Sequence, residues 1–356
     1  GTPMSVEYLR EFGKNQGFGS HLIAVVAEGS SGRIYISPDQ NQVQAAAIER
    51  PVDVPHQELP DDPRHFSGPL YGLKSYSDLF TNRQLLALKT FSGLIREVRE
   101  QILFDASATG MGEGEALQAG GKGALAYAEA VSTYLALAVS RLADYSSSIC
   151  TWNSARDGIR NVFARQAIPM SWDFAEANPF SSSSGSFLGQ VDWICRAVAH
   201  APSGQIGDAK QAPAQSRQYN GMVVSTDPPY YDNIGYSDLS DYFYVWLRPM
   251  LDSIYPDLVG TMLTPKSEEL VADPYRLGGK KKAETFFVTG LNSVFEQIHS
   301  SARPGVPLAL YYAYKQQEAD VEGSSSTGWH TLLDGLISTG WEITATWPMR
   351  TERATR

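Results

Sequence analysis

The sequence predicts an α/β protein in which a doubly wound parallel sheet carries a mostly helical insertion. From residue 221 onward, short apolar runs alternate with amphipathic segments, which is the pattern of strands and helices in such a sheet. The run at 221–226 is too apolar to expose one face, as in a strand buried on both sides. Residues 82–142, by contrast, repeat apolar side chains at helical spacing.

Residues 1–59 are expected to form a hairpin and an irregular segment attached to the core. The string HLIAVVAEGSSGRIYISP contains two runs rich in β-branched residues around a glycine-containing turn at 28–32. A second strand at 33–36 follows this turn, whereas phosphate-binding loops lead into a helix. The turn is therefore not interpreted as a cofactor loop.

Residues 60–165 are expected to form the helical insertion, our candidate for target recognition. The string TNRQ at 81–84 fits a capping box. The apolar positions that follow at helical spacing are Leu85, Leu88, Phe91, Leu94, Ile95, Val98 and Ile102. A Gly-, Ala- and Ser-rich connection at 105–123 leads to a second helix, from Leu125 to Leu142, and residues 159–164 are expected to form a third.

Residues 166–356 are expected to form the sheet and its helices. The predicted order after the strand at 221–226 is a helix at 238–248, a helix at 286–298, a strand at 306–314, a helix at 329–337 and a strand at 341–347. The first of these helices has Ser237 as its N-cap and Pro249 as its stop. We expect its apolar stripe to pack on the sheet.

Composition narrows the classes of function. The formal net charge of −10 disfavours indiscriminate binding to nucleic acid, although basic clusters at 278–282 and 350–356 fit either local basic surfaces or solvated segments. The two cysteines, Cys150 and Cys195, are too few for a disulfide framework or a four-thiolate zinc site, and we expect both to be buried. No signal peptide or membrane span is apparent, so a cytoplasmic protein without membrane contacts is expected.

The string DPPY at 227–230 directly follows the strand at 221–226. In open parallel sheets, ligands bind beyond the carboxyl ends of the strands. Pro228 and Pro229 make the loop rigid and remove two amide donors, which leaves backbone carbonyls able to accept hydrogen bonds. Asp227 adds a carboxylate and Tyr230 a ring for stacking. These residue types suit the binding of an exocyclic amine on a planar heterocycle.

Asp227-Pro228-Pro229-Tyr230 resembles the catalytic motif of the amino-group DNA methyltransferases, which use S-adenosyl-L-methionine and act on a base flipped out of the duplex. The strings STDPPYYDNIGYSDLSDYFYVWLR, LFTNRQLLAL and TWPMRTE resemble one bacterial branch, adenine-specific DNA methylases that often carry an N-terminal zinc ribbon. The resemblance implies a Rossmann-like class I methyltransferase fold and methyl transfer to N6 of adenine in DNA. It implies no resident metal.

The same resemblance assigns roles to single residues. The loop residues at 227–230 would be catalytic, and Tyr231 and Asn233 would contact the base. Asp208 and Ala209 match a short acidic motif that touches the adenine of the cofactor at the end of the preceding strand, although a Gly-Asp pair is also typical of an ordinary turn.

The sequence departs from this family at the cofactor side, because it contains no Asp-Pro-Phe-x-Gly-x-Gly string. We therefore expect a fold that is incomplete there, with another chain or a missing segment supplying the glycine-rich loop. Three alternatives stay open. They are a non-catalytic DNA-recognition or assembly subunit, an N4-cytosine methyltransferase, and an enzyme acting on RNA or on a protein side-chain amide.

Overall fold

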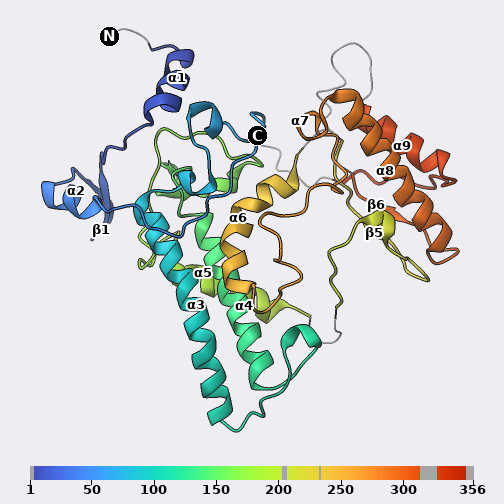
Figure 1. Cartoon of the computed structure of the whole chain (residues 1–356), viewed down its shortest axis with the longest axis horizontal. Helices are drawn as coiled ribbons and strands as arrows, with labels where there is room; N and C mark the ends of the chain where they lie inside the picture. The colour runs from blue at the N-terminus through green and yellow to red at the C-terminus, as the bar shows by residue number, and fades with distance from the viewer. Residues whose placement is uncertain (1–3, 203–206, 232–233, 313–326, 350–356) are drawn as a thin grey trace. The chain divides into compact units, whose positions relative to one another are not determined.

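A computed structural model describes residues 4–202, 207–231, 234–312 and 327–349 of the chain (Figure 1). The protein is of mixed α/β class and divides into two compact units. The first unit consists of Gly1–Gly207 and Tyr236–Pro265, and the second of Asp208–Gly235 and Lys266–Arg356. Among the described residues, no helix is both long enough and apolar enough to cross a membrane.

The first unit is mainly helical. Its elements are α1 (Val6–Gln16), β1 (Val25–Gly29), β2 (Gly32–Ile36), α2 (Gln40–Ala46), α3 (Asn82–Ala108), α4 (Ala124–Ala143), β3 (Thr151–Asn153), β4 (Gly158–Arg160), α5 (Phe187–His200) and α6 (Tyr236–Leu251). β1 and β2 pair antiparallel, which confirms the expected hairpin. The second unit contains β5 (Ser225–Thr226), α7 (Pro274–Leu277), α8 (Lys280–Ser301), β6 (Ala309–Leu310) and α9 (Thr327–Ser338).

The start of α3 follows its predicted cap. Thr81 is the N-cap, its side chain accepts a hydrogen bond from the Gln84 amide, and the Gln84 side chain accepts one from the Thr81 amide. Together these bonds satisfy two backbone donors that a helix start leaves without partners. Leu85 and Leu88 are fully buried, as their spacing predicts. The helix continues to Ala108, beyond the start of the expected connection at 105.

The core of the first unit joins α3, α4 and α6, which run side by side (Figure 1). The Tyr242 ring stacks on Phe80 with ring centroids 5.5 Å apart, and Trp246 meets the same Phe80 ring edge to face. The Tyr242 hydroxyl donates a 2.7 Å hydrogen bond to the Ala143 carbonyl. Our expectation that the apolar stripe of this helix packs on the sheet is therefore wrong, because α3, α4 and the Phe80 ring just before α3 cover it instead.

Three local predictions in the first unit need correction. Ser237 is not the N-cap of α6 but lies inside it, because the helix begins at Tyr236. Residues 159–164 do not form a helix, because β3 and β4 make an antiparallel hairpin that ends in a short 3-10 turn at Val162–Ala164. Its tight turn includes Asp157 at φ 44°, a conformation that Asp tolerates better than most residues. Pro249 also does not stop α6. It lies in the last turn, and the helix ends at Leu251.

The doubly wound sheet that the sequence predicted is not formed by the residues that the structure describes. In that part of the chain each sheet has two strands, and β5 and β6 are the pair that runs parallel. Residues 341–347, expected as a third strand, have no strand conformation. An apolar run becomes a strand only when a neighbouring backbone completes its hydrogen bonds, and composition alone cannot supply that neighbour.

The two cysteines lie in different environments, which corrects the expectation that both are buried. Cys150 is fully buried, and burial raises the pKa of its thiol to about 12. Cys195 lies on α5 and is exposed. Because only the thiolate is a good nucleophile, Cys150 should be inert in the native state.

We therefore expect a maleimide reagent at neutral pH to modify Cys195 in the native protein and to reach Cys150 only in denaturant. Mass spectrometry of the labelled peptides checks this, with Cys195→Ser as the control that should remove the native-state label. Fast labelling of Cys150 in the native chain would contradict the packing described above.

Candidate functional site

The candidate site begins at the carboxyl ends of the parallel pair. The Ala309 amide donates to the Val224 carbonyl at 3.0 Å, and the Tyr311 amide donates to the Thr226 carbonyl at 2.8 Å. This ladder places residues 227–230 immediately beyond one strand, and Tyr311 and Tyr312 immediately beyond the other. The DPPY string does follow a parallel strand, as the sequence predicts, but this strand is Ser225–Thr226 rather than 221–226. Met222 and Val223 are exposed, so the expected burial of the run on both faces is wrong.

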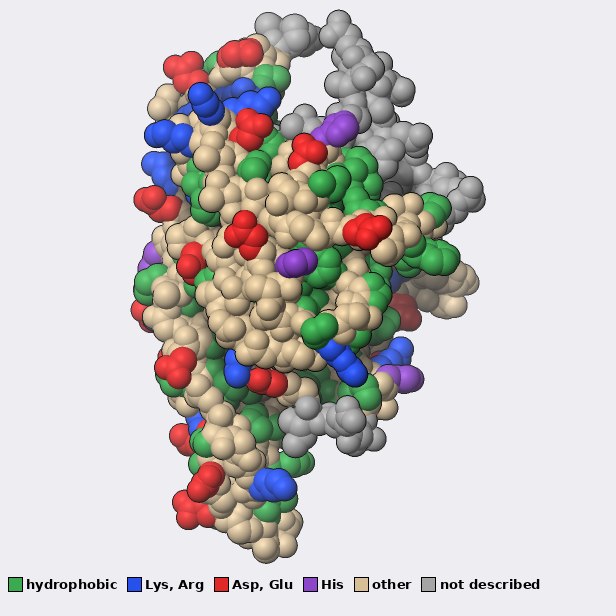
Figure 2. Space-filling model, turned by 90° about the vertical axis from the view of Figure 1, so that its right-hand side faces the viewer, with side chains coloured by type: hydrophobic (Ala, Val, Ile, Leu, Met, Phe, Trp, Pro, Cys, Tyr) green, Lys and Arg blue, Asp and Glu red, His purple; other side chains and the backbone are tan. Residues whose placement is uncertain are grey.

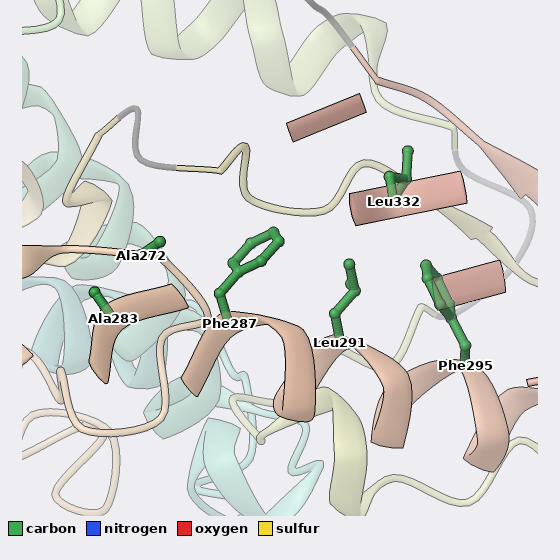
Figure 3. Packing of buried hydrophobic residues seen from close by; sticks show 6 residues of the cluster. All are labelled: Ala272, Ala283, Phe287, Leu291, Phe295 and Leu332. Carbon is green, nitrogen blue, oxygen red and sulfur yellow. The ribbon is translucent and has the colours of Figure 1, made fainter. Parts of the chain in front are cut away.

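Helix α8 packs against α9, and the two helices form the apolar layer on which β6 rests. Phe287, Leu291 and Phe295 lie on the same side of α8, facing Leu332 of α9 (Figure 3). Partly buried residues that pack on this cluster include Leu310 of β6. The parallel pair therefore rests on a packed apolar layer, which gives the loop after β5 a rigid base.

Asp227 is exposed, and its side chain makes no hydrogen bond or ion pair with the residues that the structure describes. Pro228 and Pro229 are half-buried. A carboxylate held beyond a strand end by two prolines, with its oxygens open to solvent, can accept hydrogen bonds from a ligand without first breaking a bond within the protein. Asp227 is therefore available to a ligand, and its catalytic role stays a prediction.

The two tyrosines after the prolines have different neighbours. The half-buried Tyr230 ring meets Tyr312 edge to face, with centroids 5.0 Å apart. The Tyr231 ring meets Phe287 edge to face at 5.3 Å and packs on the apolar cluster between α8 and α9. Tyr231 therefore anchors the loop to the core, and its expected contact with the base stays a prediction. Asn233 lies outside the described residues.

Tyr312 and Trp329 are site residues that our sequence analysis missed. The Tyr231 amide donates to the Tyr312 hydroxyl at 3.4 Å, and the Trp329 ring lies 6.0 Å from the Tyr312 ring. Gly328 allows this close packing, since a Cβ there would lie 2.8 Å from the Tyr312 oxygen. The available signal was the pair Tyr311-Tyr312 directly after an apolar strand, which repeats the strand-then-tyrosine pattern of the DPPY loop.

The predicted cofactor residues lie apart from any strand. Asp208 and Ala209 are exposed in a segment, residues 207–213, without regular secondary structure, and the expected strand before them falls on residues outside the described part of the chain. The Asp208 carboxylate pairs with Lys210 at 3.1 Å, and both side chains are largely exposed. Their role in cofactor binding stays a prediction. No cluster of His, Cys, Asp or Glu side chains able to hold a metal ion occurs among the residues described.

The described residues fit only part of an S-adenosyl-L-methionine site. Asp208 offers a carboxylate that could accept from a ribose or adenine donor. Its exposure leaves the adenine ring without the apolar walls that small-molecule sites normally provide. These residues therefore do not by themselves form an enclosed cofactor pocket.

We expect Tyr312 to hold the DPPY loop in place mainly through its ring. Tyr312→Ala should lower the free energy of unfolding by roughly 1–3 kcal/mol, because edge-to-face packing on Tyr230 is lost. Tyr312→Phe should cost less than about 0.5 kcal/mol, because the hydroxyl accepts only a long hydrogen bond. Urea titration followed by circular dichroism measures both, with Tyr311→Ala at the neighbouring exposed position as control. Equal costs for the two alanine variants would refute this role.

Comparisons with known proteins do not indicate a function, so any functional assignment rests on the residues described above. No family model matches the chain, and neither the curated proteins nor the solved structures include a significant match.

Proposed function

We propose that the second unit holds the exocyclic N6 amine of a flipped-out adenine in DNA for methylation by S-adenosyl-L-methionine. One observation carries this proposal. The Asp227 carboxylate is exposed beyond a parallel strand and has no hydrogen-bond partner in the described part of the chain. Beside it lie two proline residues and the ring of Tyr230, which is the set that an amine on a flat ring requires.

The residues perform separate tasks in this proposal. Asp227 and the Pro228 carbonyl accept hydrogen bonds from the two N–H groups of the amine, which favours a pyramidal nitrogen with an available lone pair. The cofactor supplies an electrophilic methyl group on a sulfonium. The amine nitrogen forms the new N–C bond as the C–S bond breaks, and the sulfur keeps that electron pair. The proton lost from nitrogen passes to Asp227 or to water.

Tyr230 stacks on the extruded base in this scheme. Extruding a base costs a few kcal/mol, and stacking on an aromatic ring returns about 1–3 kcal/mol. The T-shaped contact with Tyr312 restrains the Tyr230 ring before the base arrives. Preorganisation of this kind reduces the entropy that binding would otherwise cost.

Binding of the cofactor is expected to require residues in addition to Asp208 and Ala209. Since Asp208 is exposed and no Asp-Pro-Phe-x-Gly-x-Gly string occurs in the sequence, the methionine part would be held by another chain or by a missing segment. The same observation favours a second candidate function, a DNA-recognition or assembly subunit that keeps the amine-binding loop but does not bind cofactor. N4 of cytosine remains an alternative target, because the loop would accept its amine in the same way.

Substitution of the proposed acceptor tests the first candidate. Asp227→Asn should lower transfer of labelled methyl groups to adenine in DNA by roughly 10²- to 10⁴-fold, because the amide cannot take the proton. The exposed position of Asp227 implies an unchanged melting temperature. Asp334→Asn, at an exposed position on α9, is the matched control and should keep full activity. Wild-type activity of Asp227→Asn would exclude Asp227 as the acceptor.

Isothermal titration with S-adenosyl-L-methionine separates the two candidate functions. An enzyme that binds cofactor should release heat below about 1 mM ligand, the upper end of ordinary substrate affinities. A recognition subunit should bind DNA and give no heat with the cofactor at that concentration. The titration should be repeated with any chain that copurifies with the protein, because the cofactor site is expected to be shared.

A further inference from the structure

A groove of about 1050 Å³ extends along α8 from its first turn to Ser293. Its apolar wall includes Leu270 and Phe286, and its rim carries the three consecutive residues Lys280, Lys281 and Lys282. The oxygen Oε1 of Gln215, which also lines the groove, is buried without a hydrogen-bond partner among the described residues. We call this feature the α8 groove.

The first turn of α8 is open to an anion. Gly279 is the N-cap and has no side chain to accept from the free amides, and its φ of 124° is accessible to glycine. The helix dipole is positive at this end, where lysine side chains are unfavourable and an anion is stabilised. When no ligand is bound, the three lysines are therefore repelled by the positive end of the helix dipole.

The lysines are also without protein partners. All three are exposed, and none forms an ion pair with any residue that the structure describes. The chain carries a formal net charge of −10, so a cluster of three unpaired cations is unusual within it. Figure 2 shows several Lys or Arg side chains close together in the upper part of the face that it draws.

The buried Gln215 oxygen indicates more than a free phosphate ion. A buried acceptor without a partner costs about 1–3 kcal/mol, and a ligand that donates an N–H or O–H group removes this cost. In a matching ligand, a phosphate would pair with the lysines and an apolar ring face would pack on Phe286. A donor group of the same ligand would bond to the Gln215 oxygen. Nucleotides in a nucleic-acid strand combine these three properties.

The connectivity places the first turn of α8, where the lysines of the groove lie, toward the same edge of the parallel pair as the DPPY loop. The C-terminal end of α8 lies near the start of β5, since the Ser301 carbonyl accepts from Gly221 and Arg303 donates to Met222. The other end of α8 must then lie toward the carboxyl ends of the strands, and Phe287 contacts Tyr231 there. The lysines precede Phe287 by five to seven residues, about 8–11 Å along the axis.

We propose that the α8 groove binds the phosphodiester backbone of DNA next to the base that the DPPY loop receives. This inference rests on the proposed function, because it takes the bound strand to be the methylation substrate. The groove supplies affinity and position, whereas Asp227 supplies the chemistry. The proposal also gives a role to the basic cluster Gly278–Lys282. From the sequence alone, this cluster fitted a solvated loop equally well.

The test compares two triple variants of the full chain. Lys280, Lys281 and Lys282 are replaced by alanine in one, and in the matched control the exposed Lys14, Lys74 and Lys122 of the first unit are replaced. Both variants change the net charge equally. Fluorescence anisotropy with a labelled duplex containing adenine measures affinity from low to moderate salt, and thermal melting confirms folding. Arginine at all three α8 positions serves as a charge-preserving variant.

We expect the α8 variant to bind DNA about tenfold or more weakly than the wild type. Its slope of log affinity against log salt concentration should become shallower by up to roughly 3, because each lost phosphate contact removes about 0.9 from the slope. The control should lose much less, and the arginine variant should keep the wild-type slope. Equal losses in the two alanine variants, or no DNA binding by the wild type, would overturn the proposal.

The two proposals can fail separately. Lysine-dependent DNA binding without any methyl transfer would keep the α8 groove as a DNA site and reject the enzymatic function. Methyl transfer that depends on Asp227, with a DNA affinity insensitive to the three lysines, would keep the function and reject the groove.

Discussion

The packing of α8 against α9 is the constraint on which the candidate site depends. Phe287, Leu291 and Phe295 are almost fully buried, and burial of each such side chain contributes about 1.5–3 kcal/mol. The few hydrogen bonds between β5 and β6 would not hold a pair of two-residue strands in water. The apolar layer beneath the strands supplies the missing stability. It also orients Tyr231, and through Tyr231 the loop that carries Asp227.

Burial separates two carboxylates that look alike in the sequence. Asp241 is fully buried in α6 and accepts two 2.7 Å hydrogen bonds, from the amide and the hydroxyl of Thr264. Asp227 is exposed and is available to a ligand. A buried carboxylate that is already hydrogen-bonded stabilises the fold, whereas an exposed carboxylate on a rigid loop can accept a proton during a reaction. Their surroundings therefore suit them to different tasks.

The aromatic residues near the site combine packing with recognition. Tyr230 packs on Tyr312, and Tyr312 lies beside Trp329 at the start of α9, so the ring proposed to stack on a base is itself supported by other rings. In an edge-to-face pair the edge of one ring meets the face of the other, so the contact itself stacks nothing on the faces of the first ring. The lysines of the α8 groove complement this surface, because stacking and phosphate contacts are the two usual sources of affinity for single nucleotides in a strand.

The sequence by itself determined the local features of this protein. The capping box at Thr81 and the β1–β2 hairpin each depend on neighbouring residues, and local physics is sufficient to predict them. The tertiary structure alone decided the partners of α6, the absence of a strand at 341–347 and the role of Tyr312 beside the loop. Those outcomes depend on which distant segments meet, since an amphipathic face or an apolar run specifies that it will be buried but not against what.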